Sequence, residues 1–187
     1  MESAKTLRFP RPATWEVASL TVEDAHQVLL EHYDREQVPL RRYLSFLGMD
    51  VESARETVQE SFLKLHEHLL AGGDRTNLRA WLYRVAHNLA RNAQSSFRAS
   101  RTDLLADVSV AGEPAADEAS AEDELLEKER MTRLRDAINQ LSPAQKECLV
   151  LRSQGFKYRE IAEVLSLSVS TVAENVQRGL DKVKELL

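Results

Sequence analysis

Five side chains that can hydrogen-bond or carry charge recur three and four positions apart near the end of the chain: Ser170, Thr171, Glu174, Asn175 and Arg178. On a helix this spacing gathers them on one face. Serine, threonine and asparagine bond to base edges or phosphates, and arginine suits a phosphate or a guanine. The chemistry predicted is recognition of duplex DNA. The alternative is a helical bundle whose polar face is merely solvated.

Arginines and aromatic residues are interleaved in a second stretch. Residues 79–101 hold five arginines and no acid, with Trp81, Tyr83 and Phe97 among them. Arginines neutralise phosphates and flat rings stack unpaired bases, at about 1–3 kcal/mol per base. This composition predicts a surface for single-stranded nucleic acid. In the alternative interpretation Trp81 is largely core and Phe97 only ends the helix. The outer face is expected to carry Arg84, Asn88, Arg91 and Ser95, with Asn92 beside them.

A third group lies in residues 50–71, where two helical stripes differ in character. One is apolar and predicts a core face: Ala54, Val58, Phe62, Leu65 and Leu69. The other consists of Glu52, Glu56, Gln59 and Leu63. An apolar residue such as Leu63 within a polar patch favours a surface that contacts a partner. An ordinary solvated face is the alternative.

Local signals predict the helices that position the C-terminal group. Ser142 is a predicted N-cap with a proline at the first helical position, and Gly155 ends that helix. A second helix is predicted over residues 158–165 and a third after Ser168, which caps it. A short helix, a turn and a longer amphipathic helix predict a helix-turn-helix, with the last helix placed for the DNA major groove. Its expected inward face is Val172, Val176, Leu180 and Val183.

Four helices are predicted in the first 100 residues. Thr21 with Asp24 resembles a capping box that opens the first helix, and a separate second helix is predicted over residues 39–47. Residues 50–71 and 78–97 are predicted to form two more, so we expect an all-α protein. The residues predicted to cap these two are Asp50 and Asn77. The buried stripe expected on the fourth is Leu78, Leu82, Val85 and Leu89.

The acidity of the chain is confined to one segment. The 187 residues carry a net charge of −5, yet residues 103–129 hold ten acids against one lysine, which gives −9. The flanking parts come to +1 before this segment and +3 after it. An acidic, alanine-rich and aperiodic stretch predicts a flexible linker. We therefore expect a flexible arm, a small helical domain, the linker and a second helical domain, over residues 1–20, 21–100, 101–124 and 125–187.

Composition also disfavours several classes of protein. No apolar run is long enough to span a bilayer and the N-terminus lacks a signal-peptide core, so we expect a cytoplasmic protein without membrane insertion. The single cysteine, Cys148, falls on an apolar helix face and is interpreted as a core residue. The chain shows no glycine-rich phosphate loop, no Cys/His cluster and no nucleophile motif. We therefore expect no catalytic residue, no metal site and no cofactor.

Three motifs occur in an order and spacing that resemble a known family. They are ARETVQESFLKL (54–65), LRAWLYRVAHNLARN (78–92) and LSPAQKECLVLRSQGFKYREIAEVLSLSVSTV (141–172). The chain is similar to the extracytoplasmic-function, or group 4, sigma factors of the sigma-70 family, which have only regions 2 and 4. The resemblance covers about residues 22–100 and 125–187. It implies a helical bundle for region 2 and a helix-turn-helix for region 4.

The resemblance implies an alternative sigma factor that binds core RNA polymerase, recognises and melts promoter DNA, and starts transcription. The implied contacts with the β′ clamp helices are Glu52, Glu56, Gln59, Glu60 and Leu63. The implied minus-ten contacts are Arg79, Trp81, Tyr83, Arg84, Asn88, Arg91 and Asn92, with a flipped base held between Asn88 and the 72–77 loop. The implied minus-thirty-five contacts, in a domain resting on the β flap, are Ser168, Ser170, Thr171, Glu174, Asn175 and Arg178.

The chain departs from the family pattern in two places. Ser53 and Arg55 stand where acids are usual in the polymerase-facing helix. The last helix has Ala173 and Asn175 where basic residues are common, and Glu174 would face phosphates unfavourably. Either a low affinity for duplex DNA or an unusual promoter sequence is therefore expected. The chain is also compatible with control by an anti-sigma factor.

Two other functions stay open on the sequence. LSPAQKECLVLRSQG (141–155) also resembles the output domain of a LuxR-type transcription regulator, although residues 22–100 show helical periods where a receiver domain needs strands. A polymerase-binding decoy with little affinity for DNA agrees with the departures in the last helix. An enzyme agrees least, because nothing in the chain assembles a nucleophile, a base or a metal site.

Overall fold

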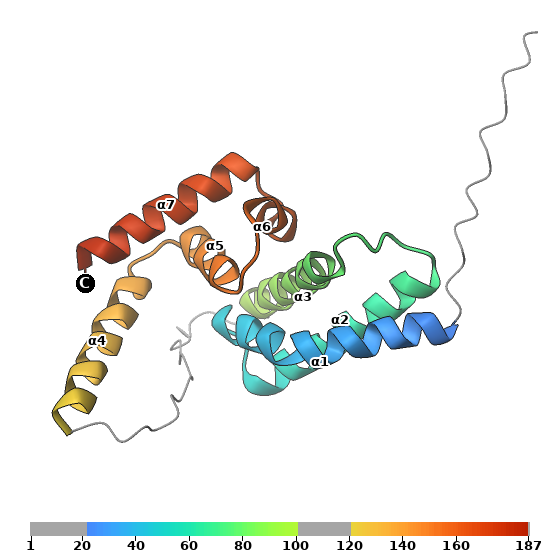
Figure 1. Cartoon of the computed structure of the whole chain (residues 1–187), viewed down its shortest axis with the longest axis horizontal. Helices are drawn as coiled ribbons and strands as arrows, with labels where there is room; N and C mark the ends of the chain where they lie inside the picture. Colours follow the sequence, from blue (N-terminus) through green and yellow to red (C-terminus); the bar gives the residue numbers. More distant parts are fainter. Residues whose placement is uncertain (1–21, 101–120, 187) are drawn as a thin grey trace, which may run out of the picture.

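The computed structural model of the chain describes residues 22–100 and 121–186 (Figure 1). These ranges form seven α-helices and no strand, so the all-α prediction is confirmed. The predicted N-terminal arm and most of the predicted linker lie outside the described residues. None of the described helices is long and apolar enough to cross a membrane. The helices are α1 (Val22–Phe46), α2 (Val51–Leu70), α3 (Leu78–Ser100), α4 (Ala121–Asn139), α5 (Pro143–Ser153), α6 (Tyr158–Leu165) and α7 (Val169–Leu186).

Helices α1, α2 and α3 pack together and form the N-terminal unit. The carboxylate of Asp50 accepts from the backbone N–H groups of Glu52 and Ser53 at 3.1 and 3.0 Å, which caps α2. Asn77 Oδ1 accepts from the backbone N–H of Ala80 at 3.2 Å, which caps α3. Both predicted caps are confirmed. The predicted core stripe of α2 is buried along its whole length: Ala54, Val58, Phe62, Leu65 and Leu69.

The two helices predicted on either side of Pro39 are a single helix, so that prediction was wrong. α1 continues through Pro39 without a break. A proline in a helix interior removes one backbone hydrogen bond and crowds the carbonyl four residues earlier, at a cost of about 3 kcal/mol. Leu40, Tyr43 and Leu44 directly after it are completely buried in the core of the unit. Burial of these side chains offsets the local cost, so tertiary packing overrides the break signal.

Helices α4 to α7 form the C-terminal unit, and its helix ends follow the local signals. Ser142 Oγ accepts from the backbone N–H of Gln145 at 3.3 Å, and Gln145 Oε1 accepts from that of Ser142 at 3.0 Å. α6 occupies the predicted residues 158–165. Ser168 Oγ caps α7 by accepting from the backbone N–H of Thr171 at 3.0 Å. The helix-turn-helix prediction is confirmed.

The inward face of α7 differs from the prediction at one position. Val172 and Val176 are buried as expected, but Leu180 is 42% exposed. Gly179 is buried in its place, and a Cβ there would lie 2.8 Å from Leu149 Cδ1 of α5. The two helices approach so closely at this level that no side chain fits between them. The hydrophobic pattern predicted burial of Leu180 because glycine has no side chain and so does not contribute to such a pattern.

α3 is covered on more than one side, because α6 of the C-terminal unit packs against it (Figure 1). Leu78 and Leu82 are buried as predicted, whereas Val85 and Leu89 are only half-buried. The additional fully buried residues of α3 are Ala80, Tyr83, Ala86, His87 and Ala90. The buried surface of α3 is therefore wider than the predicted stripe.

Candidate nucleic-acid interface

One side of α3 is open to solvent and carries four of the predicted DNA contacts: Arg84, Asn88, Arg91 and Asn92. Positions three and four apart on a helix lie above one another, so these side chains form a line. The two arginines supply positive charge for phosphates, and Asn88 between them offers both a donor and an acceptor. The line can hold a nucleic-acid backbone and hydrogen-bond to the edge of an unpaired base.

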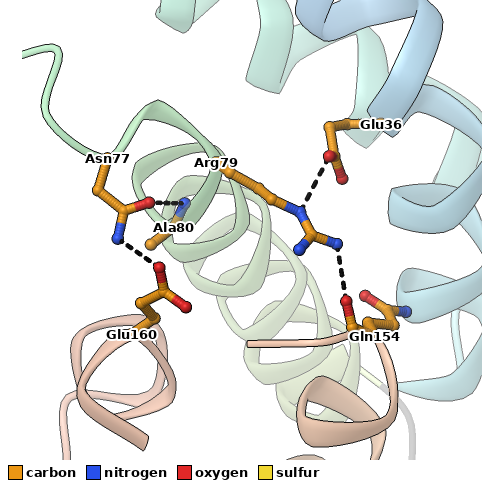
Figure 2. A network of polar contacts seen from close by, with 6 residues as sticks. All are labelled: Glu36, Asn77, Arg79, Ala80, Gln154 and Glu160. Atoms are coloured by element: carbon orange, nitrogen blue, oxygen red, sulfur yellow. Dashed lines mark hydrogen bonds and ion pairs between the residues drawn. The ribbon is translucent and has the colours of Figure 1, made fainter. Parts of the chain in front are cut away.

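Two further predicted contacts, Arg79 and Tyr83, face the C-terminal unit. Tyr83 is fully buried, and its ring centroid lies 4.7 Å from that of Phe156, in the turn after α5. Arg79 Nε lies 2.9 Å from Glu36 Oε1, and Arg79 Nη2 donates to the backbone carbonyl of Gln154 at 3.1 Å (Figure 2). In this conformation both side chains are engaged within the protein instead of lying open to DNA.

Trp81 is half-buried, and His68 covers one face of its ring. The two rings stack with centroids 4.5 Å apart and planes at 28°. His68 Nε2 donates to the backbone carbonyl of Asp74 at 2.9 Å, which ties the ring to the α2–α3 loop. A Cβ at Gly73 would lie 2.1–2.4 Å from three ring atoms of His68, so only glycine leaves room for the stack. The sequence analysis missed His68; the one local signal for its position is Gly73, where any side chain would collide with its ring.

The rest of the α2–α3 loop is held by its own polar groups. The carboxylate of Asp74 accepts from the backbone N–H and the hydroxyl of Thr76 at 3.0 and 2.9 Å, and these bonds lower its pKa. Asn77 follows, and its Nδ2 donates to Glu160 Oε1 of α6 at 3.2 Å (Figure 2). The loop predicted to hold a flipped base therefore has a defined shape, and one end of it touches the C-terminal unit.

His87 lies on the inner side of α3 and is only 2% exposed. Its Nδ1 is 2.8 Å from the hydroxyl of Tyr43, within hydrogen-bonding distance. Burial, helped by the positive charge of Arg91, lowers the pKa of His87 to about 4. The ring is therefore neutral near pH 7. It is a hydrogen-bonded core residue.

We expect the free energy of unfolding to fall as the pH drops from about 6.5 to about 4. The unfolded chain protonates His87 near its ordinary pKa of 6.5, but the folded chain does so only near 4. Between these values the unfolded state binds more protons, so acid favours unfolding, by about 3 kcal/mol in total for this group. Urea denaturation at pH 7 and pH 4.5 measures the loss. His87→Gln should lose less than the wild type, whereas His26→Gln, a change at an exposed histidine, should not differ from it.

α7 presents its predicted duplex contacts on the outer side of the helix-turn-helix: Ser168, Ser170, Thr171, Glu174, Asn175 and Arg178. Asn175 Nδ2 donates to the backbone carbonyl of Thr171 at 3.0 Å, so this amide is turned back onto its own helix. Glu174 and Arg178 form an ion pair one turn apart, with Oε1 and Nη2 separated by 2.6 Å. The only arginine of this face is therefore partly neutralised by its neighbour.

The second stripe of α2 is exposed along its length, with Glu52, Glu56, Gln59, Glu60 and Leu63 all on the surface. Leu63 is 58% exposed. Two local ion pairs, Arg55 to Glu52 and Lys64 to Glu60, measure 3.9 and 3.5 Å and join side chains that are 43–67% exposed. Pairs of this kind contribute little to stability. The stripe is an exposed leucine bordered by carboxylates.

Comparisons with known proteins match both units. Family models described as Sigma-70 region 2 and Sigma-70, region 4 match residues 32–100 and 131–183. The RNA polymerase sigma factor SigZ of Bacillus subtilis is 30% identical over 156 residues, covering 83% of this chain and 84% of that protein. The ECF RNA polymerase sigma-E factor of Haemophilus influenzae is 29% identical over 135 residues, covering 69% and 71%. This chain belongs to the extracytoplasmic-function group of the sigma-70 family.

The protein is thus an alternative sigma factor that directs transcription initiation. Its region 2 lies in the N-terminal unit and its region 4 in the C-terminal unit. A solved structure, the sigma factor RpoE of Bartonella quintana in complex with the anti-sigma factor NepR, has the same fold, with a TM-score of 0.62 at 21% identity over 86% of this chain and 96% of that one. The region 2 model matches residues 32–100, for which the LuxR-type interpretation of the sequence offered no explanation.

Proposed function

We propose that this sigma factor docks on core RNA polymerase through α2, melts and reads the minus-ten element with α3 and the 72–77 loop, and reads the minus-thirty-five element with α7. The observation that carries the proposal is the exposed line of Arg84, Asn88 and Arg91 on α3, beside a half-buried Trp81. Positive charge draws in the single strand, and an aromatic ring gives its bases a stacking surface.

The proposed polymerase contact is the exposed stripe of α2, on the β′ clamp helices. Leu63 supplies apolar area that water leaves on docking, and Glu56, Gln59 and Glu60 surround it with acceptors for basic partner groups. A buried apolar anchor with a polar rim is the usual arrangement of a protein interface. Ser53 and Arg55 weaken the negative character of this rim compared with the acids usual in the family.

The proposed duplex contact is the outer face of α7, with region 4 resting on the β flap. Ser168, Ser170 and Thr171 lie at the start of this helix, where hydroxyls and helix N-termini bind phosphates. Arg178 lies further along the helix, and its pair with Glu174 offsets part of the charge that it offers to DNA. This arrangement supports a low affinity of region 4 for duplex DNA, so that binding depends on the polymerase to hold region 4 in place.

Glu174→Gln should increase the affinity of the holoenzyme for promoter DNA about fivefold. The change removes a negative charge near phosphates and frees Arg178, which together are worth about 1 kcal/mol at this exposed site. The gain should shrink as salt is raised, because the charges are screened. Fluorescence anisotropy with a labelled minus-thirty-five duplex measures it. Glu185→Gln, the same charge change at the far end of α7, is the control; an equal gain there would assign the effect to net charge alone.

The proposal also covers where the protein acts in the cell and how its activity is controlled. The work of a sigma factor takes place where bacterial RNA polymerase is, in the cytoplasm. The Bartonella quintana sigma factor of the same fold was solved bound to an anti-sigma factor, which supports control of this chain by a partner of the same kind. A pull-down with the tagged full chain from its own cells, scored for a partner that blocks core binding, tests this extension.

The central experiment mixes the full-length protein with bacterial core RNA polymerase, measures binding, and then measures transcription from a promoter library. We expect tight core binding and transcripts from a defined set of promoters. Specific duplex binding without any core binding would contradict the proposal and favour a simple DNA-binding regulator.

A polymerase-binding decoy is the second candidate, and the Glu174–Arg178 ion pair favours it. A recognition helix whose only arginine is partly neutralised would leave a protein that binds the polymerase without placing it on DNA. Tight core binding with no transcript from any promoter, even with Glu174→Gln, is the result that would select this candidate.

A further inference from the structure

His68 joins three parts of region 2 that the proposed function uses together. It lies in the last turn of α2, its ring stacks on Trp81 at the start of α3, and its Nε2 donates to the Asp74 carbonyl in the loop between the helices. One imidazole thus contacts both the loop proposed to hold a minus-ten base and the helix proposed to read that base.

The loop is fitted to this ring through two adjacent glycines that serve different purposes. Gly72 has a φ of +73°, which favours glycine, yet a Cβ added there would meet nothing within 4 Å. Gly73 has no positive φ, but a Cβ added there would lie 2.1 Å from Cε1 of His68. The backbone N–H of Gly73 also donates to the His68 carbonyl at 2.9 Å. The loop backbone therefore lies directly against the imidazole.

Trp81 connects the ring to the side of α3 that carries the proposed DNA contacts. Trp81, Arg84 and Asn88 follow at steps of three and four, which places them on one side of the helix. Asn77 ends the loop, and its carbonyl accepts from the backbone N–H of Trp81 at 3.0 Å. Asn88 lies about 10 Å further along α3, at about 1.5 Å per residue. A shift of the stacked rings would therefore move the loop relative to the group proposed to bond the base.

Two different contacts hold the imidazole, and each can be removed without the other. Stacking needs a flat ring, and the bond to the loop carbonyl needs an N–H donor at the edge of that ring. The hydrogen bond is exposed to solvent, so its loss has little effect on the stability of the whole unit. A loop whose shape is set before DNA arrives, however, loses less conformational freedom when it binds.

We infer that His68 is a positioning residue for minus-ten recognition. Stacked on Trp81 and bonded to the Asp74 carbonyl, it holds the 72–77 loop in the place relative to α3 that capture of a flipped base requires. The inference rests on the base capture proposed above. His68 acts on DNA through the loop and Trp81, so its loss should weaken base capture and leave polymerase docking by the exposed stripe of α2 unchanged.

The first test uses the holoenzyme and fork-junction DNA from a promoter recovered from the library, with the minus-ten non-template strand unpaired. Each unpaired nucleotide is made abasic in turn, and the position at which the wild type loses most affinity marks the flipped base. We expect His68→Ala to weaken binding to the intact fork about tenfold, because a ring pair and a hydrogen bond are lost. With the flipped base absent, the loss should be about twofold at most.

Three further variants resolve the two contacts and provide the control. His68→Phe keeps a flat ring without the donor, and His68→Gln keeps a donor without the ring, so each should show part of the loss. His66→Ala is the matched control, because residues two apart on a helix face different sides. It should bind every fork as the wild type does. Anisotropy with core polymerase and thermal unfolding of each free variant check docking and fold.

The second test moves the ring without replacing it. Gly73→Ala places a methyl group against the imidazole, so the ring must leave the stack or the loop must move. In the free wild type, the ring current of Trp81 should shift the proton on His68 Cδ2 upfield, and Gly73→Ala should reduce that shift. The variant should also show the base-dependent loss of affinity. Added to His68→Ala, it should cost little more, because no ring remains to collide with.

The outcomes separate the inference from the function on which it rests. An equal loss by His68→Ala on intact and abasic forks would overturn the inference, since the histidine would then merely support the fold. Full affinity in both His68→Ala and Gly73→Ala would overturn it as well, with base capture left standing. If His68→Ala does not fold, Gly73→Ala decides. A wild type that no single abasic position weakens would contradict base capture itself, and the inference would fall with it.

Discussion

Replacing Arg84 and Asn88 together with alanine should slow promoter opening about a hundredfold while core-polymerase binding stays unchanged. Both side chains are exposed on α3, so their removal leaves no cavity. One phosphate contact and one base contact are each worth about 1–3 kcal/mol, and about 2.7 kcal/mol is a factor of a hundred. Alanine is also a good helix former, so α3 should persist.

The measurement is the fluorescence of 2-aminopurine placed in the minus-ten region, which rises as the strands separate. The salt dependence provides a second readout, because losing one phosphate contact should reduce the slope of log affinity against log salt by about one. Arg35→Ala is the matched control, because Arg35 is an exposed arginine on a different helix, α1. An equal loss in the control, or a parallel loss of core binding, would contradict the assignment of these residues to DNA.

Leu63→Asp should weaken binding to core RNA polymerase at least thirtyfold. The leucine is 58% exposed and sits among carboxylates, so an aspartate adds charge where the proposed partner surface needs an apolar anchor. Loss of a central anchor costs about 2 kcal/mol or more, which corresponds to this factor. The folded state should barely change, because substitutions at exposed positions without special contacts stay within about 0.5 kcal/mol.

Anisotropy of labelled protein titrated with core polymerase measures the change, and thermal unfolding of the free protein checks the fold. Val51→Asp is the matched control, because Val51 is 75% exposed on the same helix. An acid in the first turn of α2 is favourable for the helix dipole, so this control should fold at least as well as the wild type. Unchanged binding by Leu63→Asp would mean that the polymerase docks elsewhere.

The two predictions separate the tasks of neighbouring helices. α2 and α3 pack against each other in one core, yet their exposed faces differ in chemistry: carboxylates around a leucine on α2, arginines with asparagine on α3. The carboxylates of α2 suit a protein partner with basic groups, and the arginines of α3 suit a nucleic-acid backbone. Variants that lose one activity and keep the other are therefore the expected pattern.

Helix ends were predictable because the signals that set them act within a few residues. Ser142, Asp50, Asn77 and Ser168 all cap helices as their types and positions indicated. The core stripe of α2 was equally clear, because a regular apolar spacing leaves few ways to bury it. The exposed faces of α2, α3 and α7 followed from the same periodicity. The family membership rested on three motifs, two in the first unit and one in the second, and the comparisons confirm it.

Contacts between residues distant in sequence were not predictable, because no local pattern encodes them. Pro39 indicated a helix break, but the helix continues because the residues after the proline are buried in the core. Gly179 replaced Leu180 in the core because α5 approaches α7 too closely for a side chain. Tyr83 has the composition of a base-stacking residue, yet its burial depends on Phe156, more than seventy positions later.

The sequence thus determined, through residue spacing alone, the features that depend on near neighbours: where helices begin, which of their faces are apolar and which carry charge. It contained no signal for where region 4 sits relative to region 2. That placement depends on Arg79 finding Glu36, the Gln154 carbonyl and the Phe156 ring at once, in elements separated by a long acidic stretch. Such a contact exists only after both units have folded, since each supplies half of the groups. Whether the DNA-binding side chains are exposed or covered is therefore a property of the tertiary structure.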